Sequence, residues 1–375
     1  MNFGGPPDPD MFEVSLFGTG VGESIAVHIG QGNWLLVDSC RQRRDDFPAH
    51  LSYLQEIGVD LSKAVKLFVI THWHDDHIDG ASEVVKKCSE AKVAISSALS
   101  AQEFLKTLSI YNRRDYLLDR GKSGIQELGI ILEDIKKRNT NGEHVFSLVR
   151  THSDHLLYRS NDCSIYAISP SDTSIDKTIK EFSEIWGQIS RGEQRLIFPS
   201  PHQNHNSIAL WICYKDQRIL LGSDLEVTND SDTGWAAVLN ISLFPDGKSQ
   251  VFKIPHHGSP NGDCAEVWEK LVSPENPFLA VTSYSRGRTQ RPSDEDLGRL
   301  LDRTTNLYCT SLPKRSTIRR DSAVERTIRE VAKNRWTIGK NLGHIRIRKK
   351  GPQEEISVEV FGSADKVIKR IASVE

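Results

Sequence analysis

The sequence predicts an α/β protein in which two β-rich halves flank a mainly helical insertion at 98–200. Apolar, β-branched runs gather before and after this segment, whereas the segment itself shows the 3.6-residue periodicity of amphipathic helices. Of the 375 residues, 38% are hydrophobic and 26% are charged, which excludes collagen-like, low-complexity and disordered classes. No Gly/Ser-rich or Pro-rich linker marks a boundary, so we expect one domain spanning 1–375.

The first half begins as a meander of short strands separated by glycine-containing turns. The run VKLFVIT at 65–71 is apolar throughout and predicts a strand buried on both faces. The other strands expected in this half are 12–18, 24–30, 33–40 and 91–97, and the expected helices are 46–57 and 80–90.

The insertion and the second half follow the same reasoning. Helical periodicity covers most of 98–150 and 173–191, with a strand at 163–168 between them. The strand pattern then returns at 207–214, 218–224, 250–258 and 278–285.

Two features bear on the compartment. No run approaches the roughly 18 apolar residues of a membrane span, and the N-terminal residues lack the pattern of an export signal, so we expect a cytoplasmic protein. The six cysteines are widely spaced without a CxxC pair, which indicates reduced thiols rather than disulfides or a thiolate zinc site.

The segment Thr71–His77 (THWHDDH) directly follows the apolar strand and holds four candidate metal ligands: His72, His74, Asp76 and His77. Neither a helix nor a strand could point all four the same way, so we expect a tight loop around one or two ions. Histidine and carboxylate at this density suit Zn²⁺ or a similar transition metal.

Two later apolar strands also end in ligand-type residues. The run RILLGSD ends in Asp224, and VFKIPHHG ends in the adjacent pair His256 and His257. A further cluster, at 202–206, contains His202 and His205. We expect Asp224 and one of the adjacent pair to complete the ligand set that the first loop leaves open.

The chain resembles the metallo-β-lactamase superfamily, whose signature is HxHxDH. The likeness continues through Asp38 and the Gly-Ser-Asp at 222–224 and covers most of the chain. It looks most like the C-terminal hydrolase domain of the ComEC family of DNA-uptake channel proteins, through GTGVGES (18–24), NSIAL (206–210) and KIPHHGS (253–259). Glu23 in place of a Gly-Asp pairing, GSD in place of GD, and the missing membrane channel depart from that family.

The resemblance implies a fold and a ligand set. The fold is an αββα four-layer sandwich with the metal site at one sheet edge. His72 and His74 would bind metal one, Asp76 and His77 metal two, and Asp224 would bridge them. The late ligand would be His256, with His257 as the alternative, and a third ligand of metal one would be His205 or His202. Asp38 is expected to brace the loop by hydrogen bonds.

The implied chemistry is hydrolysis by hydroxide bound between two divalent ions about 3.5 to 4 Å apart, most simply Zn²⁺ with Mn²⁺ as the alternative. No GxSxG, P-loop or GxGxxG motif offers a rival. Besides Asp76, we expect catalytic roles for His257, as proton donor to the leaving oxygen, and for Lys253, as a phosphate contact. Ser259 is a second candidate for that contact.

The favoured substrate is a phosphodiester of DNA or RNA. The stretch from Lys314 to Lys350 contains thirteen Lys/Arg and three acidic residues. This excess of positive charge is typical of a surface that binds a polyanion. We expect a basic insertion at 311–340 and nucleic-acid contacts by Arg286, Arg288, Arg319 and Arg320. Two alternatives stay open: a hydrolase of a small nucleotide or ester, and a metal-binding component of a larger defence or DNA-processing complex with protein partners.

Overall fold

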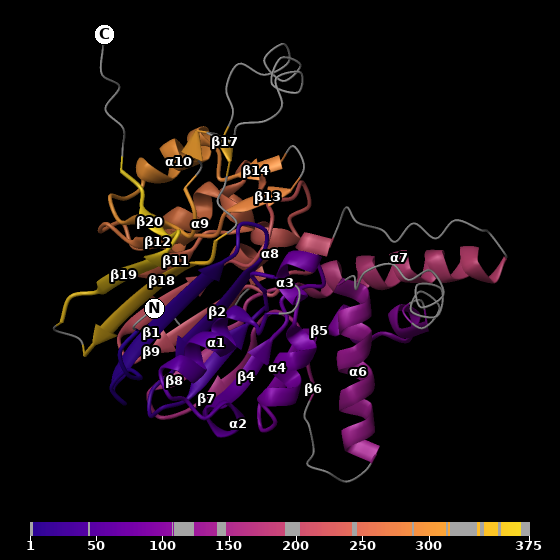
Figure 1. The fold of residues 1–375 in the computed structure, drawn as a ribbon. Coiled ribbons are helices and arrows are strands. Elements are labelled where there is room, and N and C mark those ends of the chain that lie inside the picture. Colours follow the sequence, from indigo (N-terminus) through magenta and orange to yellow (C-terminus); the bar gives the residue numbers. More distant parts are fainter. Residues whose placement is uncertain are drawn as a thin grey trace, which may run out of the picture.

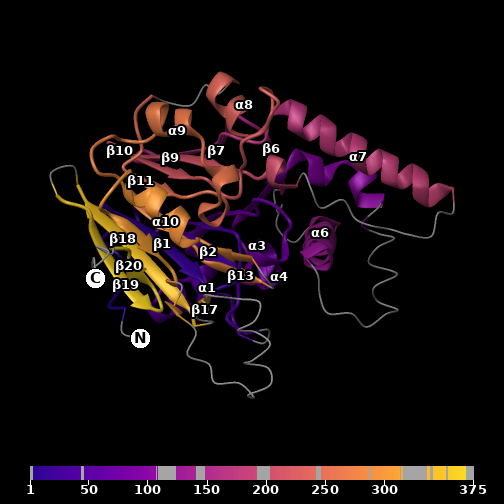
Figure 2. The same ribbon diagram turned by 90° about the horizontal axis from the view of Figure 1, so that it is seen from above.

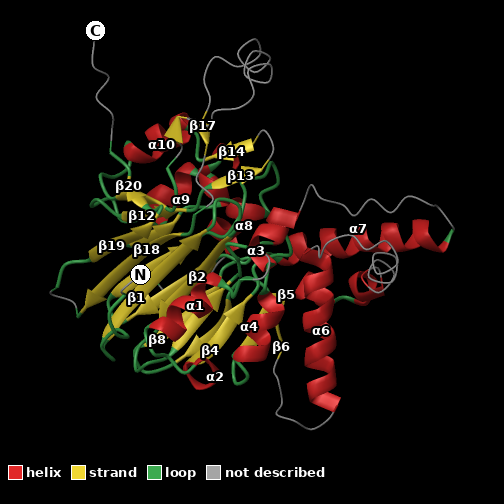
Figure 3. Cartoon of the chain, viewed as in Figure 1, coloured by secondary structure: helices red, strands yellow, loops and turns green. Residues whose placement is uncertain are grey.

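Two eight-stranded sheets face each other and carry helices on their outer faces (Figures 1 and 3). The computed structural model describes residues 3–43, 46–106, 108, 124–140, 148–191, 203–241, 246–286, 289–312, 314–315, 336–337, 341–351 and 354–368. The layers are helices, sheet, sheet and helices, so the predicted αββα sandwich is confirmed.

The first sheet has the strand order β19-β18-β1-β2-β3-β4-β5-β6. Neighbouring strands are antiparallel from β19 to β3 and parallel from β3 to β6. The strands are β1 (Met11–Gly18), β2 (Glu23–His28), β3 (Trp34–Val37), β4 (Val65–Val69), β5 (Lys92–Ser96), β6 (Leu148–Thr151), β18 (Gly343–Lys350) and β19 (Ser357–Gly362).

The second sheet has the order β20-β15-β12-β11-β10-β9-β8-β7 and is parallel from β10 to β15. Its strands are β7 (His155–Arg159), β8 (Cys163–Ala167), β9 (Leu210–Tyr214), β10 (Gln217–Leu221), β11 (Val251–Lys253), β12 (Phe278–Val281), β15 (Leu307–Cys309) and β20 (Asp365–Lys366). Two short hairpins stand apart from the main sheets: β13 (Tyr284–Arg286) with β14 (Thr289–Arg291), and β16 (Lys314–Arg315) with β17 (Trp336–Thr337).

The two-residue period of the strands explains why both faces of each sheet are buried. In β4, Leu67 and Val69 point into the core between the sheets, while Phe68 points into the core under the helices of the first sheet. In β10, Ile219 and Leu221 face the central core and Leu220 faces the outer core of the second sheet. The prediction that 65–71 is buried on both faces is therefore confirmed.

The helices divide between the two outer layers. Against the first sheet pack α1 (Ala49–Glu56), α4 (Ala81–Lys87) and α6 (Gly124–Thr140), and against the second pack α8 (Gly234–Ile241), α9 (Ala265–Lys270) and α10 (Asp294–Leu301). The long helix α7 (Asp172–Ser190) and α6 lie beside the β6 edge in both views (Figures 1 and 2). The short helices are α2 (Leu61–Ala64), α3 (Asp75–Ile78), η1 (Ser97–Ser100), η2 (Gln203–Asn206), η3 (His256–Gly258) and η4 (Pro260–Gly262).

The segment 98–200, expected as a mainly helical insertion, also contributes strands to both sheets: β6 extends the first, and β7 and β8 form the end of the second. β8 corresponds to the strand expected at 163–168. β6 and β7 are short, half-exposed strands at the sheet edges and lack the apolar runs of the central strands. The helical part comprises α6 and α7.

The last residues of the basic stretch 314–350 form β18, next to β1, and three of their cations pair with acids of β1, β19 and the N-terminal segment. Arg346 Nη2 lies 2.6 Å from Glu359, Arg348 Nε lies 2.7 Å from Glu13 and Lys350 Nζ lies 2.7 Å from Asp8. This part of the positive charge therefore stabilises a sheet, and most of 311–340 lies outside the described residues.

The topology collects the ligand-bearing segments at one place. Parallel strands of a sheet present their carboxyl ends at the same edge, and the loops after β3, β4, β10, β11 and β12 all begin at such ends. These loops carry Asp38, His72–His77, Asp224, His256–His257 and Thr282.

Candidate metal centre

The HxHxDH loop is held in shape by Asp38, which follows β3. The carboxylate of Asp38 accepts hydrogen bonds from the Thr71 backbone N–H and from its hydroxyl, both at 2.8 Å, and lies 2.8 Å from His77 Nδ1. Asp38 thus fixes both ends of the loop, as the sequence predicted, and orients His77 so that its Nε2 points away from the brace.

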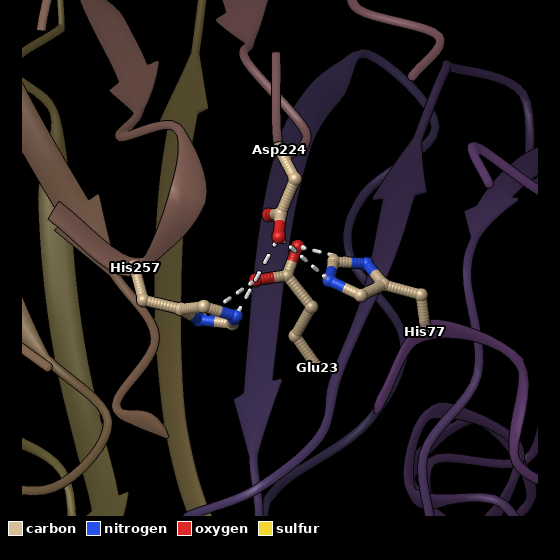
Figure 4. A group of neighbouring side chains, drawn as sticks. All are labelled: Glu23, His77, Asp224 and His257. Carbon is tan, nitrogen blue, oxygen red and sulfur yellow. Dashed lines mark ion pairs between the residues drawn. The ribbon is translucent and has the colours of Figure 1, made fainter. Parts of the chain in front are cut away.

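Four buried side chains converge next to this loop (Figure 4). Glu23, His77, Asp224 and His257 each offer a ligand atom, and these atoms all lie within 4.8 Å of one another. The four come from β2, from α3 and from the loops after β10 and β11. All four are at most 3% exposed, so the cluster is a candidate site for a divalent cation rather than a solvated acidic patch.

Asp76 belongs to the same cluster. His257 Nε2 lies 3.3 Å from Asp76 Oδ2 and 3.8 Å from Asp224 Oδ2, while His77 Nε2 lies 3.4 Å from Asp224 Oδ2 and 3.7 Å from Asp76 Oδ2. The Nε2 atoms of His77 and His257 therefore lie close to the same two carboxylates, those of Asp76 and Asp224. This arrangement brings together Asp76, His77 and Asp224, the residues expected to hold metal two and to bridge the two ions.

The late histidine of this group is His257, which corrects the expectation that His256 fills that place. Its backbone is left-handed, with φ of 53°, as is that of His256, with φ of 44°. This pair of left-handed residues turns the His257 side chain inward, where it is 3% exposed, and leaves His256 partly exposed. A proton-donor role of the kind expected for His257 does not fit its place beside Asp76 and Asp224.

The two histidines expected to bind metal one, His72 and His74, lie next to this cluster. His72 Nε2 and His74 Nδ1 are 3.0 Å apart, and the rings of His72 and His77 are 4.2 Å apart between centroids. His256 acts electrostatically on both His72 and His74 and lines the same cleft as His74. His256 therefore lies near the pair His72 and His74.

His205 does not join this group. Its Nε2 lies 3.8 Å from Glu226 Oε2, and it lines a neighbouring cleft of about 480 Å³ between α7 and the 228–233 loop. Glu226 also lies 3.0 Å from His256 Nδ1 and accepts a hydrogen bond from Asn204. The carboxylate of Glu226 separates His205 from the centre, and His202 lies outside the described residues.

The protonation states suit metal binding, which requires neutral histidines and ionised carboxylates. Burial, together with the neighbouring His77 and His74, lowers the pKa of His72 well below its ordinary value, and burial also lowers the pKa of His74. Burial opposes ionisation of Asp224, but His77, His257 and Lys253 outweigh it and hold the pKa of Asp224 well below its ordinary value.

The residues present fit a divalent ion. Burial opposes protonation of His77, yet the carboxylates of Asp224, Glu23, Asp76 and Asp38 outweigh it and raise the pKa of His77 well above its ordinary value. Such a concentration of buried negative charge is what a divalent cation neutralises. Three atoms of the cluster are also buried without a hydrogen-bond partner: His77 Nε2, Asp224 Oδ1 and Glu23 Oε1. Of these, Glu23 Oε1 has the Lys253 ammonium group as an ion-pair partner at 2.6 Å.

Backbone strain gathers at this centre. Of the eight non-glycine residues with positive φ in the described parts of the chain, four are Asp38, Ser223, His256 and His257. Such conformations persist only where the surroundings enforce them. Gly22 allows the 18–24 turn to approach the HxHxDH loop closely. A Cβ at this position would lie 3.0 Å from the Asp76 carbonyl oxygen and 2.7 Å from Cys40 Cβ, so a side chain there would not fit.

The centre opens into a cleft of about 570 Å³. Its wall includes His74, Asp76, Asp224, His256 and His257, together with the predicted contacts Ser259 and Arg286. Tyr284, Thr289 and Arg291 of the β13–β14 hairpin complete one side, and Trp73, Gly124 and Ile125 the other. Arg288, Arg319 and Arg320 lie outside the described residues.

Lys253 does not reach this cleft. It is 2% exposed, and its ammonium group lies 2.6 Å from Glu23 Oε1 and donates to the Ser223 carbonyl oxygen at 2.9 Å. The expected phosphate contact by Lys253 is therefore corrected: it stands on β11, where its side chain points beneath the metal site.

Three residues near the site were not predicted as contributors. Glu23 was noted only as a departure from a family motif, and Thr282 and Tyr284 were not singled out. The Tyr284 ring stacks on that of His257, with 5.0 Å between centroids. The signal available was their position: Thr282 and Tyr284 directly follow an apolar strand, as the other site residues do.

Comparison with known proteins adds structural relatives only. No protein-family model and no curated protein matches this chain in sequence. Among solved structures, it is similar to one described as the first B3 metallo-β-lactamase with an active-site glutamic acid, with 16% identity over 63% of this chain and 71% of that chain, and a TM-score of 0.31. It is also similar to MEM-A1, a subclass B3 metallo-β-lactamase isolated from a soil metagenome library, with 12% identity over 68% of this chain and 82% of that chain, and a TM-score of 0.33.

Among the residues that the structure describes, no helix combines the length and the apolar character needed to cross a membrane.

Proposed function

We propose that this protein is a metal-dependent phosphodiesterase or nuclease that acts on DNA or RNA. The observation that carries the proposal is the opening of the buried cluster of His77, Asp76, Asp224 and His257 into a cleft whose outer wall bears Arg286 and Ser259. Buried ligands for a divalent cation and a guanidinium at the rim together suit a substrate with a phosphate group.

Different residues of the chain have different roles in this reaction. Divalent ions bound by the cluster supply an activated water and neutralise charge that develops on a phosphoryl group. Asp38 fixes the loop that presents the ligands, and the cleft walls orient the substrate above them. Ser259 and Arg286 stand at the rim, within the same cleft as His74 and Asp76, where they contact the phosphate.

Arg286 is the better placed of the two cleft arginines for this contact. Its side chain is 65% exposed, and its partners are Asp75, at 3.4 Å, and the neighbouring Tyr284 side chain. Arg291 lies 2.8 Å from the buried Asp296 carboxylate at the start of α10, which fixes it within the fold. An incoming phosphate can therefore compete for Arg286 more readily than for Arg291.

The sequence resemblance supports the substrate class. The segments GTGVGES, NSIAL and KIPHHGS resemble those of the ComEC-like hydrolase domain, which is linked with DNA uptake, and the first and third contain residues of the site. The metals proposed are two divalent ions, with Zn²⁺ favoured by the histidine-rich set and Mn²⁺ as the alternative. A larger assembly with protein partners and a cytoplasmic location remain part of the same proposal.

A second candidate is hydrolysis of a small nucleotide or ester. The observation in its favour is the cleft volume of about 570 Å³, which lies within the range of roughly 300–1,000 Å³ typical of small-ligand sites. A polymer would have to extend beyond this volume, across the hairpin or past α6.

The deciding experiment measures metal content together with hydrolysis of labelled single- and double-stranded DNA, RNA and bis-(p-nitrophenyl) phosphate. The parent is compared with the double variant His74→Ala/Asp76→Ala and with the control His152→Ala, an exposed histidine of the β6–β7 turn. We expect about two metal ions per chain and cleavage that only the double variant loses.

Other outcomes discriminate between the candidates. Bound metal with turnover only of a mononucleotide or ester establishes the second candidate instead. Metal with no turnover of any substrate contradicts both hydrolase proposals and favours the role of a component within a complex. A folded parent that binds no metal contradicts the site itself.

A further inference from the structure

Glu23, the first residue of β2, is a buried carboxylate with both oxygens engaged. Its Oε1 lies 2.6 Å from the ammonium group of Lys253, and its Oε2 accepts a hydrogen bond from the Thr282 hydroxyl. The carboxylate is thus fixed between β11 and the loop after β12, directly beside the metal cluster.

Glu23 lies within the cluster and meets the two histidines at their Nδ1 atoms. Its oxygens lie 3.8 Å from His77 Nδ1 and 3.8 Å from His257 Nδ1. The Nε2 atoms of the same two rings instead face Asp76 and Asp224. In Figure 4, Glu23 accordingly lies between the two imidazoles. It is close enough to resemble a ligand, yet it meets the nitrogens that do not point at the shared carboxylates.

Hydrogen-bond counting fixes the tautomer of His257. A threonine hydroxyl has one hydrogen, which Thr282 gives to Glu23 Oε2. The Thr282 oxygen can therefore only accept from His257 Nδ1, which lies 3.1 Å away. With the ring hydrogen on Nδ1, the Nε2 lone pair is free and directed at Asp76 and Asp224, as metal ligation requires.

Lys253 completes this arrangement. Its ammonium group neutralises Glu23, lies 3.9 Å from Asp224 Oδ1 and donates to the Ser223 carbonyl oxygen at 2.9 Å. Lys253 thus fixes the position of the Glu23 carboxylate, and the Glu23 oxygen next to Thr282 accepts the hydroxyl hydrogen, so that this hydrogen points away from His257.

We propose that Glu23 is a positioning residue that, held in place by Lys253, acts through Thr282 to fix the metal-binding tautomer of His257, and that Glu23 does not itself bind the metal. The proposal rests on the metal centre of the proposed function but on no particular substrate. It also gives Lys253 a role that its burial allows.

The test is metal binding by the full chain, measured by competition with a chromophoric chelator for Zn²⁺ and by the visible spectrum after Co²⁺ loading. Thr282→Val removes the hydroxyl that connects Glu23 with His257 and changes neither a proposed metal ligand nor a charge. Thr282→Ser restores the hydroxyl. Thr151→Val, another fully buried threonine, on β6, is the matched control.

We expect Thr282→Val to bind the second metal ion about 10- to 100-fold more weakly and to change the Co²⁺ spectrum, because loss of an outer hydrogen bond to a ligating histidine has effects of this size. Thr282→Ser and Thr151→Val should match the parent. Glu23→Gln should resemble Thr282→Val, and the double variant Glu23→Gln/Lys253→Met keeps the comparison valid if the lone buried cation prevents folding.

Two results overturn the proposal. One is parent-like affinity and spectrum for Thr282→Val. The other is complete loss of one metal ion in Glu23→Gln while Thr282→Val keeps both with full affinity, which makes Glu23 a direct ligand. Since no substrate enters these measurements, a parent that binds two metal ions but cleaves no phosphodiester leaves this test intact, whereas a parent that binds none contradicts both proposals.

Discussion

His77 Nδ1 lies 2.8 Å from Asp38 Oδ2, and the same carboxylate accepts two hydrogen bonds from Thr71. One buried side chain after β3 thus connects the first and last parts of the HxHxDH loop. The loop is short and carries its ligands on an irregular backbone, so its shape depends on this external brace.

Asp38→Asn should weaken the site and the fold together. The Asp38 carboxylate now accepts from the Thr71 N–H, the Thr71 hydroxyl and His77 Nδ1. The asparagine amide would place an NH₂ donor opposite one of these donors, and an unsatisfied buried group costs about 1–3 kcal/mol of unfolding free energy. Metal affinity should fall about 10- to 100-fold. Urea unfolding and metal titration measure the two effects, and Asp60→Asn, at the exposed N-cap of α2, is the control. Unchanged metal affinity in Asp38→Asn would contradict the bracing role.

His257→Ala and His256→Ala should differ in metal stoichiometry. His257 faces Asp76 and Asp224, so its removal should abolish binding of one of the two ions. His256 is paired with Glu226, and its removal should leave the ion at His77 in place. Elemental analysis after gel filtration counts the ions. The reverse pattern would restore His256 as the late ligand.

Metal removal should destabilise the protein, because the folded chain alone assembles the ligands. At a free metal concentration of 100 times the dissociation constant, the unfolding free energy should be about 2.7 kcal/mol higher than after chelation. Thermal unfolding with and without a chelator measures this difference. The double variant His74→Ala/Asp76→Ala should show little of it, and an equal shift in that variant would place the stabilising ion elsewhere.

Arg286→Gln should raise KM for a polynucleotide about tenfold with little change in kcat, because the guanidinium lies at the rim of the cleft. The slope of log affinity against log salt should also fall by about 0.7–0.9, the value for one lost phosphate contact. The control is Lys270→Gln, a surface lysine paired with Glu266. If both variants shift the slope equally, Arg286 makes no specific phosphate contact.

His50→Leu should make stability less sensitive to acid. Burial lowers the pKa of His50 to about 3, with the Asp38 backbone partly opposing this. The unfolded chain therefore binds a proton below pH about 6.5 that the folded chain refuses, so stability is complete above that pH and falls towards pH 3. The parent should lose up to about 1.4 kcal/mol per pH unit more than the variant in this window. Equal slopes in urea titrations at pH 4–7 would contradict this.

The sequence allowed the ligand-bearing segments to be predicted because each is local: an apolar strand followed at once by His or Asp. It did not decide between His256 and His257, since their left-handed backbone breaks the alternation of side-chain directions. Glu23 and Lys253 could not be recognised as partners because β2 and β11 are far apart along the chain and belong to different sheets. Likewise, Arg346 and Arg348 belonged to a basic segment by composition, and only the pairing of β18 with β1 shows their acidic partners.

The pairing of β1 with β18, from Met11 opposite Lys350 to Gly18 opposite Gly343, has a consequence for synthesis on the ribosome. β1 is synthesised early, but its second edge is covered only after β18, near the end of the chain, has been synthesised. Until then one edge of β1 stays unpaired, whereas β2 is already covered on both sides by β1 and β3. We therefore expect chain breaks after β15 to leave this edge exposed and to give a form that aggregates through it.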